Sequence, residues 1–451
     1  MIEDPLQIGR LRTAFLGNQI SASELVERVL TRIAKWDDPA LWITRTRDAS
    51  LRQHAAELDA AAAADPDLIK RLPLFGIPFA VKDNIDVAGT PTTAACPAFA
   101  YTPPETAPVV QQLLSAGAVL VGKTNLDQFA AGLVGTRSPY GVPRNPFDAR
   151  YIPGGSSSGS AVAVAAGLVS FALGTDTAGS GRVPAAFNNI IGLKPTRGLL
   201  STRGVVPACR SLDCVSVFTL SAQDASAVLD VAARFDLDDP LAREAPSAEL
   251  RSFGPKFRFG VPPPGDLEFF GDREAESLFA AATAKLEQVG GTRVKTAFAP
   301  FREAGRLLYS GPWLAERLHA TQALLDDDPD AILPVTRSII EKGRHYSALD
   351  AYRAQYELAR LKREVDLAFE SIDVLVLPTA GTIYETAAVA ADPFRLNANL
   401  GLYTNFANLL DLTAIAVPAG FRKNGLPFGI SLIAPAFAER ALLDLTARFH
   451  A

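Results

Sequence analysis

The sequence predicts an α/β protein, because two kinds of segment alternate along it. Short apolar runs bounded by Gly, Pro and Asp read as strands, and segments with apolar residues at helical spacing separate them. The chain has 451 residues, which is about three domains at roughly 150 residues each, although large α/β enzymes reach this length as one unit. We find no internal repeat and no low-complexity linker, so we expect a single domain over residues 1–451.

Four segments make up this expected domain. They are an N-terminal helical layer (about residues 1–70), a core rich in Gly, Ser and Ala (about 71–220), a helical region (about 221–370), and C-terminal strands with a helix (about 371–451). In the first segment, Ser21 and Glu24 form a capping box ahead of apolar residues at helical spacing, which predicts an amphipathic helix.

Local patterns predict the other elements. We expect a strand over residues 79–81 that ends at Lys82, a helix and then a strand over 106–124, helices over 272–289 and 312–326, strands over 373–377 and 413–417, and a tight turn at Asn424-Gly425. Between about residues 221 and 370 the pattern is that of amphipathic helix.

Composition and charge exclude two classes of partner. Lys plus Arg number 44 against 49 for Asp plus Glu, which gives a net charge of -5 with no long run of either sign. A nucleic-acid partner would need a basic face, so we expect none. The longest apolar stretch, residues 160–173, is too short to cross a bilayer, so we place it in the core and expect no membrane contact.

Cysteines and the N-terminus favour a reducing compartment. The three cysteines (Cys96, Cys209 and Cys214) are too few and too irregularly spaced for a disulfide scaffold or a zinc site. The N-terminus is acidic and lacks the apolar core of a signal peptide, so we expect a cytoplasmic protein that is mature from Met1. Its four histidines have no H-x-x-x-H spacing, and we expect no metal and no cofactor.

Two motif matches do not fit their surroundings. Residues 117–124 match the phosphate-loop pattern, but the residues between the glycines are themselves an apolar strand, whereas that loop needs flexible backbone there. Residues 155–159 match the nucleophile elbow of α/β-hydrolases, but Pro153 and Gly154 stand where its strand should be. The histidines that follow, His319, His345 and His450, lie in ordinary helical or loop contexts. We therefore predict neither nucleotide binding nor a Ser-His-Asp triad.

The residues around Ser180 favour another kind of serine chemistry. Gly179 and Gly181 let the backbone fold closely around the Ser180 hydroxyl, so that successive N–H groups converge on one oxygen, as a tetrahedral oxyanion requires. With no histidine nearby, the candidate base is a lysine that burial keeps neutral, and Lys82 ends an apolar strand. The alternative for Lys82 is an ion pair with Asp83 or Asp86.

Several motifs resemble the amidase signature family of serine hydrolases. They are residues 81–84 (Val-Lys-Asp-Asn), 154–159 (Gly-Gly-Ser-Ser-Ser-Gly), 174–182 (Gly-Thr-Asp-Thr-Ala-Gly-Ser-Gly-Arg) and 192–196 (Gly-Leu-Lys-Pro-Thr). The resemblance covers nearly the whole chain and implies a large twisted mixed β-sheet with helices on both faces, and we expect a homodimer.

The same resemblance implies the roles of the catalytic residues. Ser180 is the nucleophile, Ser156 the bridging serine beside a cis peptide bond, and Lys82 the base. The backbone N–H groups expected to form the oxyanion hole are those of Thr177, Ala178, Gly179 and Ser180. We assign Asp176 and Arg182 to support of this loop.

Departures from the common family pattern resemble the allophanate hydrolase branch. Ala178 replaces a usual Gly, and Gly181 a larger apolar residue. In that branch, the residues matching Tyr309 and Arg317 hold a substrate carboxylate, and Gly132 contributes backbone contacts. Pro312 suits the first position of a helix, which puts Arg317 in the second turn and Tyr309 in the preceding loop. The alternative is a surface Arg317 in a salt bridge, with Tyr309 packing at a helix end.

The expected reaction is hydrolysis of allophanate, a small carboxylated urea derivative, to ammonia and an N-carboxycarbamate that loses carbon dioxide. Three alternatives stand beside it: the glutamine-hydrolysing amidase subunit of a tRNA-dependent amidotransferase, a general small-amide amidase, and an inactive scaffold. Full-length allophanate hydrolases often carry a further C-terminal domain, so we expect either a natural single-domain form or a protein from which that domain is missing.

Overall fold

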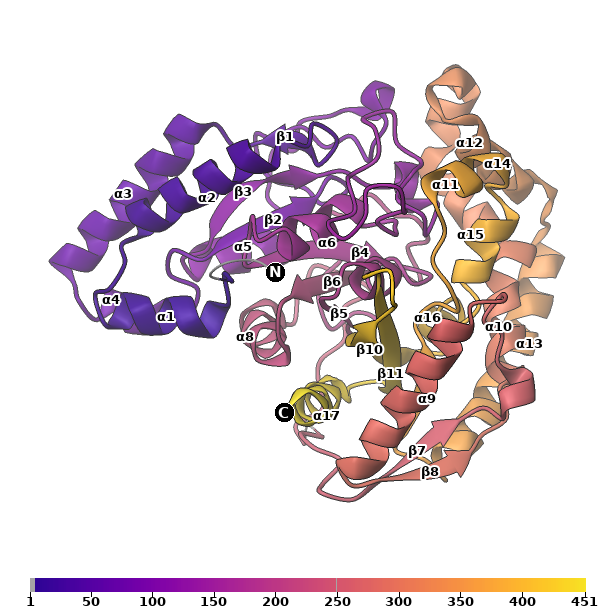
Figure 1. The fold of residues 1–451 in the computed structure, drawn as a ribbon. Helices are drawn as coiled ribbons and strands as arrows, with labels where there is room; N and C mark the ends of the chain where they lie inside the picture. Colours follow the sequence, from indigo (N-terminus) through magenta and orange to yellow (C-terminus); the bar gives the residue numbers. More distant parts are fainter. Residues whose placement is uncertain (1–4, 249) are drawn as a thin grey trace.

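An 11-stranded mixed β-sheet runs through the centre of the computed structural model, which describes residues 5–248 and 250–451 (Figure 1). The strand order is β1-β3-β2-β4-β6-β5-β10-β11-β9-β7-β8. Strands β3, β2 and β4 are parallel, as are β9, β7 and β8, and the remaining neighbours are antiparallel. The mixed sheet that the family resemblance implies is therefore present.

The strands have the following bounds: β1 (Trp42–Arg45), β2 (Pro78–Lys82), β3 (Val119–Thr124), β4 (Phe171–Asp176), β5 (Ile191–Lys194), β6 (Cys214–Thr219), β7 (Phe257–Val261), β8 (Gly291–Lys295), β9 (Val374–Pro378), β10 (Leu412–Phe421) and β11 (Pro427–Pro435). The strands expected over 79–81, 373–377 and 413–417 match β2, β9 and β10, and the turn at Asn424-Gly425 joins β10 to β11.

The α-helices have the following bounds: α1 (Ile8–Leu16), α2 (Ala22–Trp36), α3 (Asp48–Ala64), α4 (Leu68–Arg71), α5 (Pro108–Ser115), α6 (Ser158–Ala165), α7 (Val183–Phe187), α8 (Ala222–Ala232), α9 (Arg273–Gln288), α10 (Ala299–Ser310), α11 (Trp313–Asp327), α12 (Pro334–Ile340), α13 (Ala348–Phe369), α14 (Thr386–Ala391), α15 (Arg395–Leu400), α16 (Phe406–Leu409) and α17 (Glu439–His450). Helix α2 begins at the predicted capping box, in which Ser21 Oγ accepts from the Glu24 N–H and the Glu24 carboxylate accepts from the Ser21 N–H.

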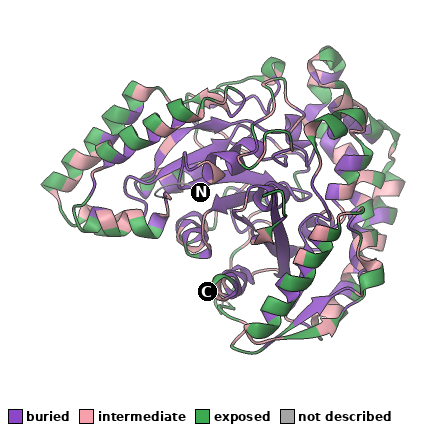
Figure 2. Ribbon diagram, viewed as in Figure 1, coloured by how far each residue is buried: buried purple, intermediate pink, exposed green. Residues whose placement is uncertain are grey.

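Helices cover both faces of the sheet, and the side chains of strand β9 pack against helices on each face. Because side chains alternate along a strand, Val374 and Val376 pack into the core cluster that includes α9 and α17, whereas Leu375 and Leu377 pack into a second cluster with α10, α13 and α16. Figure 2 shows the result: the central strands are buried, the edge strand β8 is partly exposed, and most helices are exposed on their outer sides.

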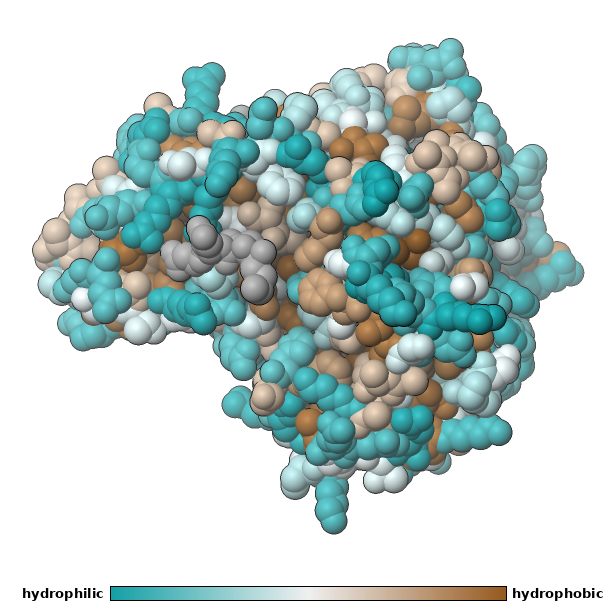
Figure 3. Space-filling model, in the orientation of Figure 1, coloured by the Kyte–Doolittle hydropathy of each residue, from teal (hydrophilic) through white to brown (hydrophobic). Residues whose placement is uncertain are grey.

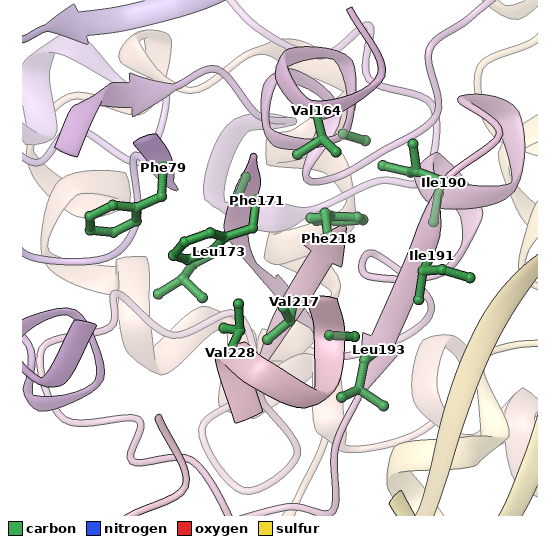
Figure 4. Packing of buried hydrophobic residues seen from close by; sticks show 14 of the residues in the cluster. Phe79, Val164, Phe171, Leu173, Ile190, Ile191, Leu193, Val217, Phe218 and Val228 are labelled. Atoms are coloured by element: carbon green, nitrogen blue, oxygen red, sulfur yellow. The ribbon is translucent and has the colours of Figure 1, made fainter. Parts of the chain in front are cut away.

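The centre of the core is aromatic and β-branched. The rings of Phe79 on β2 and Phe171 on β4 stack at 5.1 Å between centroids, and Phe218 and Leu193 extend the same cluster onto β6 and β5 (Figure 4). The apolar stretch over 160–173, expected in the core, lies in α6, in β4 and between them, and is buried apart from two half-buried alanines. No helix in the described ranges is long and apolar enough to span a membrane. The face in Figure 3 is mostly hydrophilic, with small apolar patches.

Two features of the middle segment differ from expectation. Strands β7 and β8 lie within residues 221–370, where we expected only amphipathic helix. Each has five residues, and the burial pattern of β8, a strand at the end of the sheet, shows no regular alternation, so it carries no period-two signal in the sequence. Tyr309 also lies in helix α10 rather than in a loop, because α10 extends to Ser310 before the chain turns into α11.

The phosphate-loop match contains a strand, as its sequence context indicated. Gly117 precedes strand β3, which holds the apolar residues of the phosphate-loop match. The three cysteines are unpaired and buried. Within residues 5–248 and 250–451, no group of three or more His, Cys, Asp or Glu side chains is placed to hold a metal ion.

Candidate active site

The candidate catalytic residues meet at the carboxyl ends of two neighbouring parallel strands. Val81 on β2 lies opposite Leu173 on β4, so the next residues of both strands emerge at the same edge of the sheet. Lys82 is the last residue of β2, and the loop that carries Ser180 follows directly after β4. The sheet therefore places the Lys82 amine and the loop that carries the Ser180 hydroxyl at the same edge.

Lys82 is fully buried and bonded to two hydroxyls. Its Nζ donates to Ser156 Oγ at 2.8 Å and to Thr175 Oγ1 at 2.7 Å. Burial lowers the pKa of Lys82 to about 7, against the opposing effect of Asp127, Asp213 and Asp176. A large share of the molecules therefore holds a neutral amine near pH 7, which is the state that a general base requires.

The alternative interpretation of Lys82 as an ion-pair partner of Asp83 or Asp86 is wrong. Asp83 pairs instead with the second buried lysine, Lys123, at 3.1 Å, and Asp86 accepts hydrogen bonds from Thr92 and Tyr101. Lys82 thus has no carboxylate in direct contact within the described part of the chain.

Ser156 follows a cis peptide bond with Gly155. The two neighbouring serines are occupied elsewhere: Ser157 Oγ donates to the Thr175 carbonyl at 3.1 Å, and Ser158 begins helix α6. Of the three serines, Ser156 is the one whose hydroxyl contacts Lys82.

A buried ion pair fixes the loop that carries Ser180. Arg182 donates to both carboxylate oxygens of Asp176 at 2.9 Å, and both side chains are fully buried. Burial alone would raise the pKa of Asp176, but Arg182 holds it below its ordinary value. The Asp176 carboxylate also accepts from the N–H groups of Gly179 (2.9 Å) and Gly181 (3.0 Å), so it closes the loop around Ser180.

These hydrogen bonds contradict one of the four expected oxyanion-hole donors. The N–H of Gly179 donates to Asp176 and is therefore not free to bind an oxyanion. Among residues 5–248 and 250–451, the N–H groups of Thr177, Ala178 and Ser180 have no acceptor, and no group is hydrogen-bonded to Ser180 Oγ. Three of the four expected donors thus remain available beside a free hydroxyl.

Asp213 holds the other side of the same loop. Its buried carboxylate accepts from the Thr177 hydroxyl and from the N–H groups of Ala208 and Cys209. Burial raises the pKa of Asp213 to about 6, while Thr177 and Arg317 oppose the rise. Asp213 therefore orients Thr177 and lies within electrostatic reach of Arg317.

Tyr309 and Arg317 lie together against this loop. The Arg317 guanidinium stands over the Tyr309 ring, 5.2 Å from its centroid, and Tyr309 packs with Ala178 and Leu308 in one apolar cluster. Arg317 is only 3% exposed, which excludes the alternative of a surface salt bridge. Its Nε and Nη2 atoms are buried and have no hydrogen-bond partner in the described chain. A cationic fork of this kind fits a planar anion such as a carboxylate.

Gly132 lies in a loop that is joined to Ser156. The N–H of Asp127 donates to the Ser156 carbonyl at 3.0 Å, and the N–H of Gly155 donates to the Leu133 carbonyl at 2.8 Å. A Cβ on Gly132 would come within 2.7 Å of Asp127 Oδ2, so only glycine fits there. The structure thus joins the loop of Gly132 to the segment that carries Ser156.

Sequence reasoning missed three residues of this site. Thr175 contacts Lys82, Asp213 binds Thr177, and Asp127 accepts from the backbone N–H groups of the loop after Gly132. Thr175 stands inside the 174–182 motif, whose spacing was a usable signal. Asp213 and Asp127 belong to none of the motifs in the sequence, and the fold alone reveals them.

Known proteins resemble this chain over most of its length. The family described as Amidase matches residues 24–443. Urea amidolyase of Saccharomyces cerevisiae is 49% identical over 381 residues, which are 84% of this chain and 21% of that protein. A glutamyl-tRNA(Gln) amidotransferase subunit of Symbiobacterium thermophilum is 37% identical and covers 98% of this chain and 95% of its own length.

A solved structure extends the likeness to the fold. Allophanate hydrolase of Kluyveromyces lactis superimposes with a TM-score of 0.89 at 44% identity, over 95% of this chain and 69% of that one. The chain spans about a fifth of the length of the urea amidolyases that it matches. Since the family match covers nearly all of the sequence and the fold agrees with it, the chain belongs to the Amidase family.

Proposed function

We propose that this protein hydrolyses the terminal amide of allophanate (urea-1-carboxylate) through an acyl-enzyme, with Ser180 as nucleophile, Ser156 as proton relay and Lys82 as base. The products are ammonia and an N-carboxycarbamate, which loses carbon dioxide. The observation that carries the choice of substrate is Arg317, a buried guanidinium with two unpartnered nitrogens. A substrate carboxylate supplies the missing partner.

The contact between Lys82 Nζ and Ser156 Oγ supports the first step of the relay. The step between Ser156 and Ser180 is part of the proposal. When Lys82 is neutral, its lone pair accepts a proton from Ser156 across the 2.8 Å contact, and Ser156 in turn accepts the proton of Ser180. The freed Ser180 oxygen attacks the amide carbon, and the N–H groups of Thr177, Ala178 and Ser180 bind the oxyanion. The proton then returns through Ser156 to the departing nitrogen, which leaves as ammonia, and water repeats the cycle on the acyl-enzyme.

Substrate placement uses the second group of residues. Arg317 and Tyr309 hold the carboxylate of allophanate on the side of the oxyanion loop that faces α10 and α11, and the Gly132 backbone contacts the urea portion. The name of the Kluyveromyces lactis relative, an allophanate hydrolase, supports this substrate. So do the names of the urea amidolyases, within which this chain matches one part.

The setting of the enzyme is also part of the proposal. It acts as a homodimer in the cytoplasm without metal or cofactor, and residues 1–451 form one domain. The amide-cleaving step needs these residues alone and no further C-terminal domain, because every group named in the relay comes from them.

The test is ammonia release by the purified protein from allophanate, with malonamate as a stable comparator and glutamine as the rival substrate. We expect turnover of the two carboxylated amides. Turnover of glutamine alone would favour an amidotransferase component, which the Symbiobacterium thermophilum relative represents.

The Arg317→Ala variant tests the carboxylate contact. Because a hydrogen bond to a charged group contributes about 1.5–3 kcal/mol, we expect kcat/KM for malonamate to fall by roughly 100-fold. A neutral primary amide such as propionamide should lose much less. Equal losses on both amides would show that Arg317 supports the fold of the site and binds no carboxylate.

A further inference from the structure

A basic cavity of about 310 Å³ lies next to the candidate active site. Four of its lining residues are cationic, namely Arg137, Arg302, Arg306 and Lys342, and none of the described residues that line it is acidic. The catalytic residues do not line it, so it is a separate space. Tyr309, however, forms part of its wall and also contacts Arg317.

These four cations lack counterions. Within residues 5–248 and 250–451, no ion pair joins any of them to a carboxylate. Arg137 is 5% exposed, and its two terminal nitrogens donate to the carbonyls of Ala131 (2.7 Å) and Pro393 (2.6 Å), but its buried Nε has no partner. The buried Nε of Arg302 is also unpartnered.

Two carboxylates close to these cations are engaged elsewhere. Asp127, which acts on Arg137 through space, accepts from the N–H groups of Val134 and Gly135. Glu303, beside Arg302 on α10, lies 3.6 Å from Arg360 on α13. The protein thus concentrates positive charge in a concave space without compensating it, which costs free energy unless an anion occupies that space.

Tyr309 joins the cavity to the Arg317 site, because this residue lines the one and contacts the other. Arg302, Arg306 and Tyr309 are spaced i, i+4 and i+7 on α10, so they share one face of that helix. Leu133, the neighbour of Gly132, lines the opposite wall. Apolar walls of this kind have a low dielectric constant and focus the potential of the cations into the cavity.

We propose that this cavity is an antechamber that captures the carboxylate of the anionic substrate and passes it across Tyr309 to Arg317. The identity of the anion rests on the proposed function. The carboxylate first meets Arg306 and Lys342, which are exposed, and then Arg302 and the deeper Arg137. Capture raises the rate of association and lowers KM, because the field concentrates substrate at the entrance.

The double variant Arg306→Gln/Lys342→Gln tests the antechamber. Both side chains are exposed, so their loss leaves the core intact. The matched control is Arg10→Gln/Lys35→Gln, which removes one arginine and one lysine, both exposed, from helices α1 and α2 at the far side of the molecule (Figure 1). Both variants change the net charge equally.

The quantity to measure is kcat/KM for allophanate, at low and at high ionic strength. At about 10 mM salt, where the Debye length is about 30 Å, we expect the antechamber variant to lose about tenfold in kcat/KM, mostly through KM. At about 1 M salt, where the Debye length is about 3 Å, the two variants and the wild type should converge. Losses that are the same in both double variants, or that persist at high salt, would overturn the proposal.

A binding measurement separates this inference from the proposed function. Isothermal titration calorimetry with inorganic phosphate should show that the wild type and the Arg10/Lys35 control bind this anion. The antechamber variant should bind it with an affinity at least tenfold lower. This result stands even if allophanate is not turned over, in which case the substrate is wrong and the anion site is right. Equal phosphate affinity in all three proteins would show that the cavity holds no anion.

Discussion

At the scale of a single residue, the proposed relay depends on whether Lys82 carries a proton. Burial lowers its pKa to about 7, and only the neutral amine accepts the proton of Ser156. We therefore expect kcat/KM to fall as the pH drops below about 7 and to level off above it. This acid limb of the pH profile reports the pKa of the base in the free enzyme. A pH profile of kcat/KM for malonamate measures the pKa of this acid limb. A limb near the ordinary lysine pKa would contradict the assignment.

Thr175 sets the position of that limb. Its hydroxyl accepts a hydrogen bond from Lys82 Nζ at 2.7 Å, and an ammonium is the stronger donor, so the contact favours the charged form. The Thr175→Val variant should therefore move the acid limb of kcat/KM to lower pH, with a smaller kcat because the amine is less well oriented. Thr413→Val, which removes a buried hydroxyl on strand β10, is the control and should leave the limb in place. An unshifted limb in Thr175→Val would mean that the hydroxyl has only a packing role.

Some single residues could be predicted from the sequence and others could not. Lys82, Ser156 and Ser180 stand in motifs of fixed spacing, and the sequence was sufficient to propose them as the catalytic residues. The support of this loop by Asp176 was predicted, but the particular donor was not: the Gly179 N–H, expected in the oxyanion hole, binds the Asp176 carboxylate. The missing partner of Arg317 is likewise a property of three-dimensional packing.

At the scale of an element, the loop between β4 and α7 has no room for a side chain at Gly179. A Cβ there would lie 2.3 Å from Thr404 Oγ1, and the φ of +133° is one that residues with side chains rarely adopt. We expect Gly179→Ala to lower the free energy of unfolding by several kcal/mol, on the order of an overpacked core site, and to abolish turnover.

Gly89→Ala is the matched control for that prediction. Gly89 also has a positive φ, +70°, but nothing lies within 4 Å of an added Cβ. It should cost only about 1 kcal/mol, from backbone strain alone, and should retain activity. Urea denaturation of both variants makes the comparison. An equal loss in the free energy of unfolding for both variants would show that the Thr404 side chain moves to make room for the added Cβ.

Elements with strong local signals were predicted, and elements defined by their neighbours were not. Helix α2 begins at a capping box and buries Leu25, Val26 and Val29 as expected. Strands β7 and β8 were missed because each has five residues and gains its hydrogen bonds from strands far away in the chain, so no local pattern marks them. Tyr309 was placed in a loop because Pro312 was expected to begin a helix, and the sequence did not show that α10 continues to Ser310 just before it.

At the scale of the whole molecule, the sheet joins two halves of one site. Lys82, Ser156 and Ser180 come from the segment around β2 and β4, whereas Tyr309 and Arg317 come from α10 and α11. They meet because Ala178 and Leu308 share an apolar cluster. The sequence predicts each half from its own motif, but the distance between the halves depends on how the sheet is ordered, and no local pattern encodes that order.

Burying Lys82 also makes the stability of the whole protein depend on pH. Its pKa is about 7 in the folded protein, against a reference value of 10.5 for the free side chain. Between these values the unfolded chain binds more protons than the folded one, so the free energy of unfolding rises with pH, by up to about 1.4 kcal/mol per pH unit. Below pH 7 both states are protonated, and the folded state bears the full cost of the buried charge.

The Lys82→Met variant isolates this contribution. Methionine fills a similar volume without a charge, so its free energy of unfolding should lack the rise that Lys82 produces between about pH 7 and 8.5, where the wild type gains about 2 kcal/mol. Asp213 titrates in a lower window, since burial raises its pKa to about 6. Urea denaturation at the two pH values gives the difference. The same rise in both proteins would show that Lys82 is not the group that loses its proton on folding, and the relay would then have no neutral amine to begin with.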